Sequence, residues 1–563
     1  MHVKQVSSGG FDMALPAVTV NSSWDQVFLG LAGGELESCL PGFLQQSRWF
    51  GGKAREIKAV SLEQTVPVAG DALQAVIAFL RVEYGQGSGE LYLLPLGYAT
   101  GAEEARILEE HPAAVVLRLT IREKGEGGLL FDALVRPAFG EFLFRSIELQ
   151  RQLKADGAQI ISRSAPMLRH LRTSSGPLAE PRVLTVEQSN TSIAYGQQFI
   201  LKVMRRLEGG INPELEIGLF LTEKGFEHVP AVAGSLEYVP SRGEPATLAI
   251  LELFIPNEGD AWSYTVSALG RYYDRIMARH HSVGPAPAPG RSITELVDRP
   301  LPPEWLDMAG DSVESAHLLG RRTAELHVAL ASATEDPRFS PEPFSILYQR
   351  SLNRSMRNLT KTVYRTLRRK RRDVEEKAGA EALMVFDMED DILELFQKIL
   401  KTKLAGQRIR CHGDLHLGQV LYTGTDFVII DFEGEPAQSI GERKIKHSPL
   451  KDVAGMLRSF NYAAYSVLFE QRDGGLICSE EIDVYRRGTD VWTACVSALF
   501  LRAYLAVAAS GHFLPETMDQ VQLLLDLYLL EKAIYELGYE LNHRPDWIVI
   551  PLEGIRRLLE RED

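Results

Sequence analysis

Asp414, Gln419 and Asp431 are spaced along the segment "CHGDLHLGQVLYTGTDFVIIDFEG", which spans residues 411–434. Gln419 follows Asp414 by five positions (419 − 414 = 5), and Asp431 follows it by 17 (431 − 414 = 17), directly after the apolar run "FVII". Phosphoryl transfer needs a carboxylate that takes the proton of a hydroxyl, and carboxylate or amide oxygens that hold Mg²⁺. The segment therefore predicts Asp414 as a catalytic base and Gln419 and Asp431 as magnesium ligands.

The interval between Asp414 and Gln419 matches the protein-kinase pattern, in which a loop Asn follows the catalytic Asp by five residues. Gln419 stands in place of that Asn, and its amide oxygen reaches a cation from one methylene farther away. The longer interval leaves room for a short hairpin, with Asp431 where its second strand ends. The alternative is that both aspartates only cap loops.

A cation for the phosphates is expected from Lys202, near the end of the strand-like run "QQFILKVM". The following segment "INPELEIGLFLTEKG" has Asn-Pro at a helix start and apolar residues at helical spacing. Its Glu214 or Glu216 should pair with Lys202, and Glu216 is favoured. The other predicted nucleotide-binding residues are Ser189, Asn190 and Thr191 in the loop "EQSNTS", and Glu252 in the strand "ATLAILELF".

Two histidines flank the predicted base. His412 is expected to hold the loop through hydrogen bonds, and His416 is a candidate substrate contact. The chain has no Walker GxxxxGK[ST] sequence, which argues against a P-loop enzyme.

Near the C-terminus, the segment "LLEKAIYELGYELNHRPDW" repeats Tyr-Glu four residues apart. On a helix this spacing places Glu536 and Glu540 on one face, with two tyrosine rings beside them. Such a face can bind sugar hydroxyls or an amine. It can equally be a solvated helix face on which Lys532 and Arg544 neutralise the two carboxylates.

Size and composition indicate a globular protein of several structural units. The chain has 563 residues, of which 45% are hydrophobic and 24% charged, and a formal net charge of −14. That charge argues against a general nucleic-acid binder. Four scattered cysteines without a CxxC pair favour reduced thiols. With no long apolar run or signal-peptide pattern, a cytoplasmic protein without a membrane span is expected.

The chain changes character along its length. Residues from about 24 to 125 alternate as in a small, mostly antiparallel sheet with an early helix, and residues 126–255 supply the strands and helix around Lys202. From about residue 261 helical periodicity dominates, including one long charged helical stretch over residues 351–386. The stretch around Asp414 is the only strand-like break expected there.

Taken together, these motifs resemble the maltokinases, relatives of the aminoglycoside phosphotransferases. The matching tracts, in chain order, are "SRWFGGKAREI", "EQSNTS", "LKVMRRLEGGINPELE", "CHGDLHLGQVL", "IIDFEGEP", "DVAGMLRSFNYAAY" and "YELNHRPDW". The resemblance implies an α+β, bilobal protein-kinase-like fold with a β-rich N-lobe, a helical C-lobe and an N-terminal β-rich cap domain. The expected divisions are 1–125 for the cap, 126–255 for an intermediate piece and the nucleotide-binding lobe, and 256–563 for the helical lobe.

The resemblance also implies ATP- and Mg²⁺-dependent phosphorylation of maltose at its anomeric hydroxyl, feeding α-glucan (glycogen) synthesis. It assigns Asp414 as the base and places Glu433, Glu435 and Arg443 beside the sugar, because they lie in the matching "DFEGEP…GER" tract. Similar modules are fused to trehalose synthase, so an association with that enzyme is a further expectation.

Two other functions stay open at this point. One is a kinase for another sugar or amino sugar, such as glucosamine, because Glu536 and Glu540 could bind an amine. The other is a non-catalytic partner module of trehalose synthase, against which the retention of Lys202, Asp414 and Asp431 argues.

Overall fold

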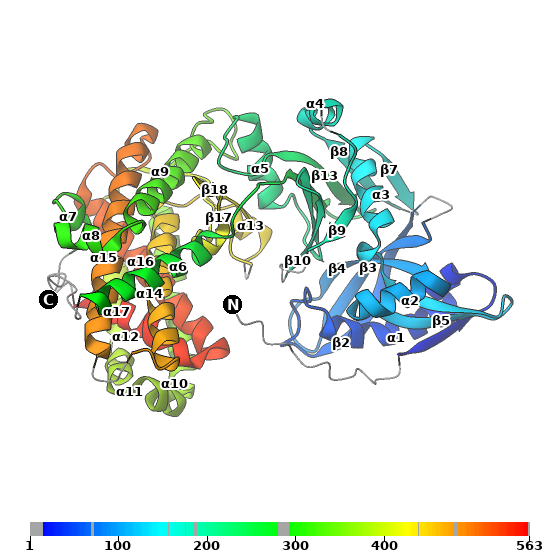
Figure 1. The fold of residues 1–563 in the computed structure, drawn as a ribbon, viewed down its shortest axis with the longest axis horizontal. Helices are drawn as coiled ribbons and strands as arrows, with labels where there is room; N and C mark the ends of the chain where they lie inside the picture. The colour runs from blue at the N-terminus through cyan, green and yellow to red at the C-terminus, as the bar shows by residue number, and fades with distance from the viewer. Residues whose placement is uncertain are drawn as a thin grey trace. The chain divides into compact units, whose positions relative to one another are not determined.

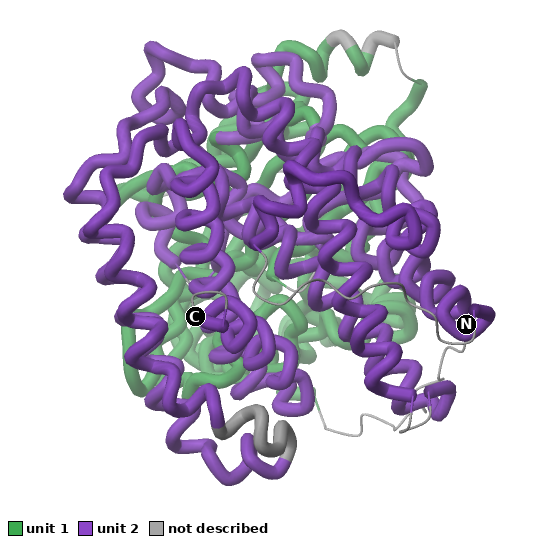
Figure 2. The backbone as a smooth tube through the Cα atoms, turned by 90° about the vertical axis from the view of Figure 1, so that its left-hand side faces the viewer, with its two compact units in different colours: residues 1–216, 231–254 green, residues 217–230, 255–563 purple. Residues whose placement is uncertain are grey.

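The computed structural model describes residues 15–68, 73–155, 157–174, 176–184, 189–279, 292–436, 438–477 and 481–560. The chain divides into two compact units, coloured separately in Figure 2. Residues 1–216 and 231–254 form the first unit, and residues 217–230 and 255–563 form the second. The first is rich in β-strands and the second is helical, so the fold is α+β as expected (Figure 1).

The first sheet of the β-rich unit has the strand order β1-β5-β6-β4-β3-β2, with β12 also pairing with β4. Only β1 and β5 run parallel among these pairs, which confirms the expected mostly antiparallel sheet. Its strands are β1 (Ala17–Val20), β2 (Ile57–Pro67), β3 (Ala75–Tyr84), β4 (Glu90–Ala99), β5 (Val115–Ile121), β6 (Glu126–Asp132) and β12 (Arg206–Leu207). The early helix is α1 (Gly30–Gln46), whose Leu36, Leu40 and Leu44 form one apolar stripe buried in the core beside this sheet.

The second sheet of this unit has the order β7-β8-β13-β14-β11-β10-β9. Its strands are β7 (Gln152–Ala155), β8 (Ala158–Ser164), β9 (Pro181–Val183), β10 (Asn190–Tyr195), β11 (Phe199–Met204), β13 (Val232–Val239) and β14 (Ala246–Leu253). The helices of the unit are α2 (Gly101–Glu110), α3 (Pro137–Glu148), α4 (Pro166–Ser174) and the start of α5 (Pro213–Glu223). Lys202 therefore sits on a central strand, between β10 and β14.

The two sheets share one hydrophobic core. Phe79 of the first sheet stacks on Tyr238 of the second, with 3.9 Å between ring centroids. A buried ion pair joins Arg205, which follows β11, to Asp132 at the end of β6. Because β6 begins at Glu126 and pairs with β4 and β5, the first sheet continues past the boundary expected at residue 125.

The second unit is built mainly from helices. They are the end of α5, then α6 (Ala261–Ala278), α7 (Ile293–Val297), α8 (Pro303–Ala309), α9 (Ser312–Leu330), α10 (Ile346–Arg369), α11 (Arg371–Asp387), α12 (Glu389–Lys401), α13 (Ile440–Arg443), α14 (Leu450–Asp473), α15 (Ile482–Ala508), α16 (Met518–His543) and α17 (Val549–Leu559). The predicted hairpin is present as β17 (Val420–Tyr422) and β18 (Phe427–Ile429). A second short pair, β15 (Glu342–Pro343) with β16 (Gln407–Arg408), was not expected.

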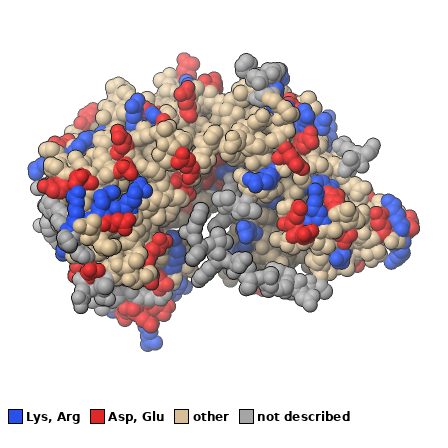
Figure 3. Space-filling view, viewed as in Figure 1, with Lys and Arg blue, Asp and Glu red and all other residues tan. Residues whose placement is uncertain are grey.

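The long charged stretch is helical as expected, and it consists of two helices, α10 and α11, which meet at Lys370. Lys370 donates hydrogen bonds from its ammonium to the Leu541 carbonyl and the Asn542 side chain at the end of α16. On the face drawn in Figure 3, acidic and basic side chains of the described residues are interspersed.

Among the described residues, one helical stretch, Ile482–Gly511, is long and apolar enough to cross a membrane by length and composition. In its most apolar window 61% of the residues are buried inside the protein, as in the core helix of a globular domain. It packs against α9, α14 and other helices of the second unit.

A close contact between two helices of this core, α9 and α15, depends on a glycine. α9 presents the small residues Ala316, Gly320 and Ala324 at helical spacing, all buried. A Cβ added at Gly320 would overlap the carbonyl group of Phe500 on α15. The α9–α15 distance therefore leaves no room for a side chain at that position.

We expect Gly320→Ala to lower the free energy of unfolding by about 1–3 kcal/mol, because one of the two helix backbones must shift. The matched control is Gly270→Ala on α6, where an added Cβ meets nothing within 4 Å. That change should raise stability by up to about 1 kcal/mol through helix propensity. Urea unfolding of both variants is the measurement, and equal effects of the two substitutions would contradict the packing argument.

Candidate active site

The loop that carries Asp414 is held by a buried carboxylate in the first turn of α14. Asp452 is 1% exposed, and its two oxygens accept hydrogen bonds from the backbone N–H groups of His412 and Gly413, at 2.8 and 2.9 Å. The Nε2 atom of His327 lies 3.0 Å from the same carboxylate. Burial opposes ionisation, but the hydrogen bond and charge of His327 dominate and lower the pKa of Asp452 to about 2.

The same face of α14 fits the loop closely. Gly455 lies one turn after Asp452, and an added Cβ there would come within 2.5 Å of the Leu415 carbonyl oxygen. One turn further, the Ser459 hydroxyl accepts a hydrogen bond from the Leu417 N–H. Although the matching tract "DVAGMLRSFNYAAY" was recognised in the sequence, Asp452 was not given a role there, because its partners are distant in the chain.

His412 ties the base loop to the loop after β18. Its Nε2 atom lies 2.9 Å from the Ile430 carbonyl oxygen, which is a scaffold contact of the expected kind. The Ile430 N–H donates to the Gln419 carbonyl at 2.9 Å. The backbone segments that carry Asp414, Gln419 and Asp431 are therefore fixed against one another.

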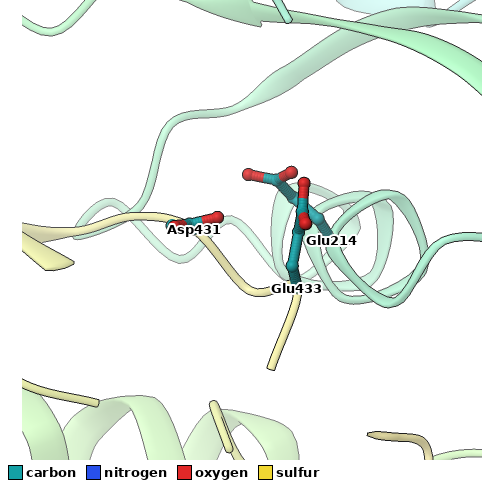
Figure 4. A group of neighbouring side chains, drawn as sticks. All are labelled: Glu214, Asp431 and Glu433. Carbon is teal, nitrogen blue, oxygen red and sulfur yellow. The ribbon is translucent and has the colours of Figure 1, made fainter. Parts of the chain in front are cut away.

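Asp431 has a backbone φ of +65°, one of three positive values among the described non-glycine residues. This left-handed conformation costs of order 1–3 kcal/mol in a residue with a Cβ, and such strain is concentrated at functional sites. Figure 4 shows Asp431 and Glu433 on this loop, and their carboxylate oxygens lie within 4.8 Å of each other. Carboxylate oxygens are ligands that suit Mg²⁺, and Gln419 as a further ligand stays a prediction.

Asp414 is partly buried and accepts a hydrogen bond from the Lys532 ammonium on α16, with 2.9 Å between Nζ and Oδ1. Burial alone would raise the pKa of Asp414, but the positive charge of Lys532 and its hydrogen bond lower it more strongly. The pKa is therefore lowered and the carboxylate is ionised at neutral pH. From the sequence, Lys532 is expected only as a partner of the α16 carboxylates.

A cavity of about 350 Å³ opens beside Asp414, entirely within the second unit. Its volume lies in the range of small-molecule sites. The aromatic residues in its lining are Trp262, Tyr462, Tyr535, Tyr539 and Trp547. His416 also lines it, with Nδ1 accepting from the Gly418 N–H, while burial lowers the pKa of the imidazole. A neutral His416 is thus left with its Nε2–H as the free donor.

Each α16 carboxylate that lines the cavity has an arginine partner. Glu536 accepts two hydrogen bonds from Arg458, at 2.9 and 2.6 Å, and Glu540 accepts two from Arg544, at 3.0 and 2.7 Å. Glu540 is 1% exposed, so this face is not a solvated surface. Of the two expected cations, Arg544 does pair with it, whereas Lys532 bonds to Asp414 instead.

The residues expected beside the sugar on the 433–443 segment are not among the described residues that line this cavity. Glu435 adjoins it through Tyr535, whose hydroxyl donates to Glu435 Oε1 at 2.5 Å. Arg443 Nη1 donates to the Glu433 carbonyl at 3.2 Å. A direct sugar contact by Glu433, Glu435 or Arg443 stays a prediction.

In the first unit, Lys202 on β11 pairs with Glu214, with 2.9 Å between Nζ and Oε1. The preference for Glu216 is therefore corrected: Glu214 is the carboxylate placed against the lysine. The Asn212 side chain accepts from the Glu214 N–H at 2.8 Å and so caps the start of α5. With the helix start fixed there, the first acidic residue of α5, Glu214, lies against Lys202.

The other predicted nucleotide-binding residues lie on the same sheet. Asn190 and Thr191 begin β10, and Ser189 precedes it, whereas Glu187 and Gln188 of the expected loop lie outside the described residues. The Thr191 hydroxyl accepts a hydrogen bond from Arg205 at 2.8 Å, and Glu252 lies on β14 opposite Ile200 of β11.

Comparisons with known proteins agree with this architecture. Residues 43–135 match the maltokinase N-terminal cap domain, and residues 276–434 match the phosphotransferase enzyme family. A glucosamine kinase of Streptacidiphilus jiangxiensis is 23% identical over 394 residues, covering 69% of this chain and 75% of that protein. A glucosamine kinase of Mycolicibacterium smegmatis (strain ATCC 700084 / mc(2)155) is 24% identical over 391 residues, covering 67% and 79%.

A solved structure of a glucosamine kinase in complex with glucosamine, ADP and inorganic phosphate has a TM-score of 0.57 to this chain. It is 18% identical and covers 88% of this chain and 93% of its own. The fold is therefore that of the kinase-like phosphotransferases, and the chain is a phosphotransferase whose acceptor is a hydroxyl group. More particularly, it is a maltokinase-like, aminoglycoside-phosphotransferase-like protein with an N-terminal cap domain.

We expect Asp452→Asn to lower the free energy of unfolding at pH 7 by about 2 kcal/mol, because the wild-type pKa lies well below the ordinary aspartate value. A depressed folded-state pKa gives stability that is present above pH 4 and is lost as the pH falls toward 2. The variant should therefore show a flatter pH dependence of stability over that range.

Urea unfolding between pH 7 and pH 3 measures this, with Asp473→Asn on the exposed end of α14 as the control. An Asp452→Asn protein with the wild-type slope would show that Asp452 is not the titrating group.

Proposed function

We propose that the protein is an ATP-dependent sugar kinase that phosphorylates maltose at the anomeric hydroxyl, giving maltose 1-phosphate. The observation that carries the proposal is the position of Asp414. It lies in the lining of a cavity rich in aromatic and polar side chains, on the loop that precedes the hairpin, and Asp431 and Glu433 follow the hairpin.

In this proposal Asp414 orients the acceptor hydroxyl and takes its proton as the new P–O bond forms. Its lowered pKa keeps it ionised, which suits a base that positions the hydroxyl in a loose phosphoryl-transfer transition state. Asp431 and Gln419, with Glu433, would hold Mg²⁺, which when bound neutralises charge on the phosphates. In the first unit, Lys202 would contact the phosphates while Glu214 fixes its side chain.

The cavity favours a neutral sugar. Glu536 and Glu540 are each neutralised by an arginine through two hydrogen bonds, and Asp414 is neutralised by Lys532. Asp260, the other carboxylate of the lining, accepts from the Ser263 N–H at the positive end of α6. Aromatic rings beside compensated polar groups suit the apolar faces and hydroxyls of a glucoside such as maltose.

The second candidate is an amino-sugar kinase, which the two glucosamine kinase relatives favour. Their identity of 23–24% leaves room for a different acceptor. A third proposal, a non-catalytic partner of trehalose synthase, requires that the ion-paired Lys202 and the strained Asp431 have no chemical role. An association of an active kinase with trehalose synthase is compatible with the main proposal.

We expect ATP consumption in the presence of Mg²⁺ with maltose, little with an aminoglycoside, and at least about tenfold lower kcat/KM with glucosamine than with maltose. Coupled detection of ADP across these acceptors is the measurement, and ³¹P NMR of the product identifies the hydroxyl. Turnover with glucosamine alone would replace maltose by the amino sugar. ATP binding without turnover of any sugar would favour the partner module.

We expect Asp414→Asn to lower kcat by at least about 10²-fold, the usual contribution of a general base, with nucleotide affinity near the wild-type value. The control is Asp426→Asn, a carboxylate on the hairpin that follows Asp414; it pairs with Arg322 and lies outside the cavity lining. That variant should lose stability and keep its kcat below its unfolding temperature. Activity retained by Asp414→Asn would remove Asp414 from the mechanism.

A further inference from the structure

Lys532 differs from the other cations around the cavity in what it neutralises. Arg458 and Arg544 are each bound through two nitrogens to a glutamate of α16. Lys532 instead donates to Asp414, the carboxylate that an acceptor hydroxyl must reach, and its Nζ lies 5.0 Å from the centroid of the Tyr535 ring. Its ammonium therefore stands at the reacting end of the cavity.

The charges that face Lys532 keep it protonated. Burial would lower the pKa of its ammonium, but Asp414, Glu536 and Glu435 outweigh burial, and the pKa is raised. His416, which also lies beside Asp414, is neutral because burial lowers its pKa. At neutral pH the acceptor thus meets one fixed positive charge beside the base.

A hydroxyl group and an ammonium group of an acceptor would interact differently with the Asp414–Lys532 pair. A sugar hydroxyl can donate its hydrogen to Asp414 and accept one from Lys532, because an O–H group is both donor and acceptor. A protonated amine is a donor only, and it would face a like charge in a partly buried site, where screening is weak. A neutral amine regains an acceptor lone pair and avoids the repulsion.

We propose that Lys532 is a specificity-determining residue that admits neutral sugars and rejects sugars carrying a protonated amine. The inference rests on the proposed sugar-kinase function and names the residue that sets its acceptor class. Lys532 selects by charge and by hydrogen-bonding capacity at the base, whereas the arginine-paired glutamates shape the rest of the cavity.

The test compares glucose with glucosamine, two acceptors of nearly equal size that differ in one group. In the wild-type protein, kcat/KM for glucose should exceed that for glucosamine by at least about tenfold at pH 6.5. The ratio of kcat/KM for glucose to kcat/KM for glucosamine should fall as the pH rises through the pKa of the amine of glucosamine. In Lys532→Met this ratio should be about tenfold smaller than in the wild type at pH 6.5, and it should no longer depend on pH.

Lys532→Arg should keep the discrimination, because it keeps the charge. Lys361→Met, at an exposed lysine of α10 outside the cavity lining, should leave it unchanged. A purely structural role for Lys532 would lower both activities together and leave their ratio and its pH dependence as in the wild type. That result, or a wild-type preference for glucosamine, overturns the inference. If Lys532→Met does not fold, the inference is still tested by the pH dependence of the wild-type ratio and by the ratio measured for Lys532→Arg.

Equilibrium binding separates failure of this inference from failure of the proposed function. Trp262 and Trp547 line the cavity, so intrinsic fluorescence reports sugar binding without turnover. If no sugar is phosphorylated, the kinase proposal fails. The inference then stands if glucose binds more tightly than glucosamine and Lys532→Met removes the difference, and it falls if the two sugars bind alike.

Discussion

The second unit is organised around one buried anion. Asp452 accepts hydrogen bonds from two consecutive backbone N–H groups of the base loop and faces His327, so its charge is satisfied on every side. A buried carboxylate without such partners would be strongly destabilising, whereas one with them specifies a single loop geometry. The direction of Asp414, and through His412 the position of the loop that bears Asp431, follow from this contact.

The cavity beside Asp414 also depends on ion pairs. Its walls come from α6, the base loop, α14 and α16, which are widely separated in the chain. The two α16 carboxylates that line the cavity, Glu536 and Glu540, are each held by two nitrogens of an arginine, which fixes their direction more firmly than a single contact does. The polar groups of the cavity are therefore pre-organised, so that binding a sugar need not order them.

The first sheet, which lies mostly in the cap, and the second sheet, which carries Lys202, form one unit because they share a hydrophobic core. β11 leads through Arg205 into β12, which pairs with β4 of the cap sheet. Arg205 pairs with Asp132, donates to Thr191 and stacks over Trp49 at 4.5 Å. The strand that carries Lys202 is thus anchored to the cap, which gives the cap a structural role in positioning this lysine.

The sequence by itself determined the elements whose signals are local. The hairpin between Asp414 and Asp431, the strand of Lys202, the α5 start at Asn-Pro and the helical second half all follow from short-range spacing and turn chemistry. The fold class and the class of phosphotransferase followed from the family resemblance that these motifs carry. The division of one charged stretch into α10 and α11 did not, because the residue between them bonds to the distant α16.

Only the tertiary structure decided which charged groups meet. Glu214 and not Glu216 faces Lys202 because the Asn212 cap sets the rotation of α5, and helical spacing alone allows either. Asp452 and Lys532 act on Asp414 and its loop from 38 and 118 positions away (452 − 414 = 38, 532 − 414 = 118), across helices that no sequence period relates. An ion pair forms where the fold brings two charged side chains together. The sequence shows which charged residues the chain contains, but not which of them meet.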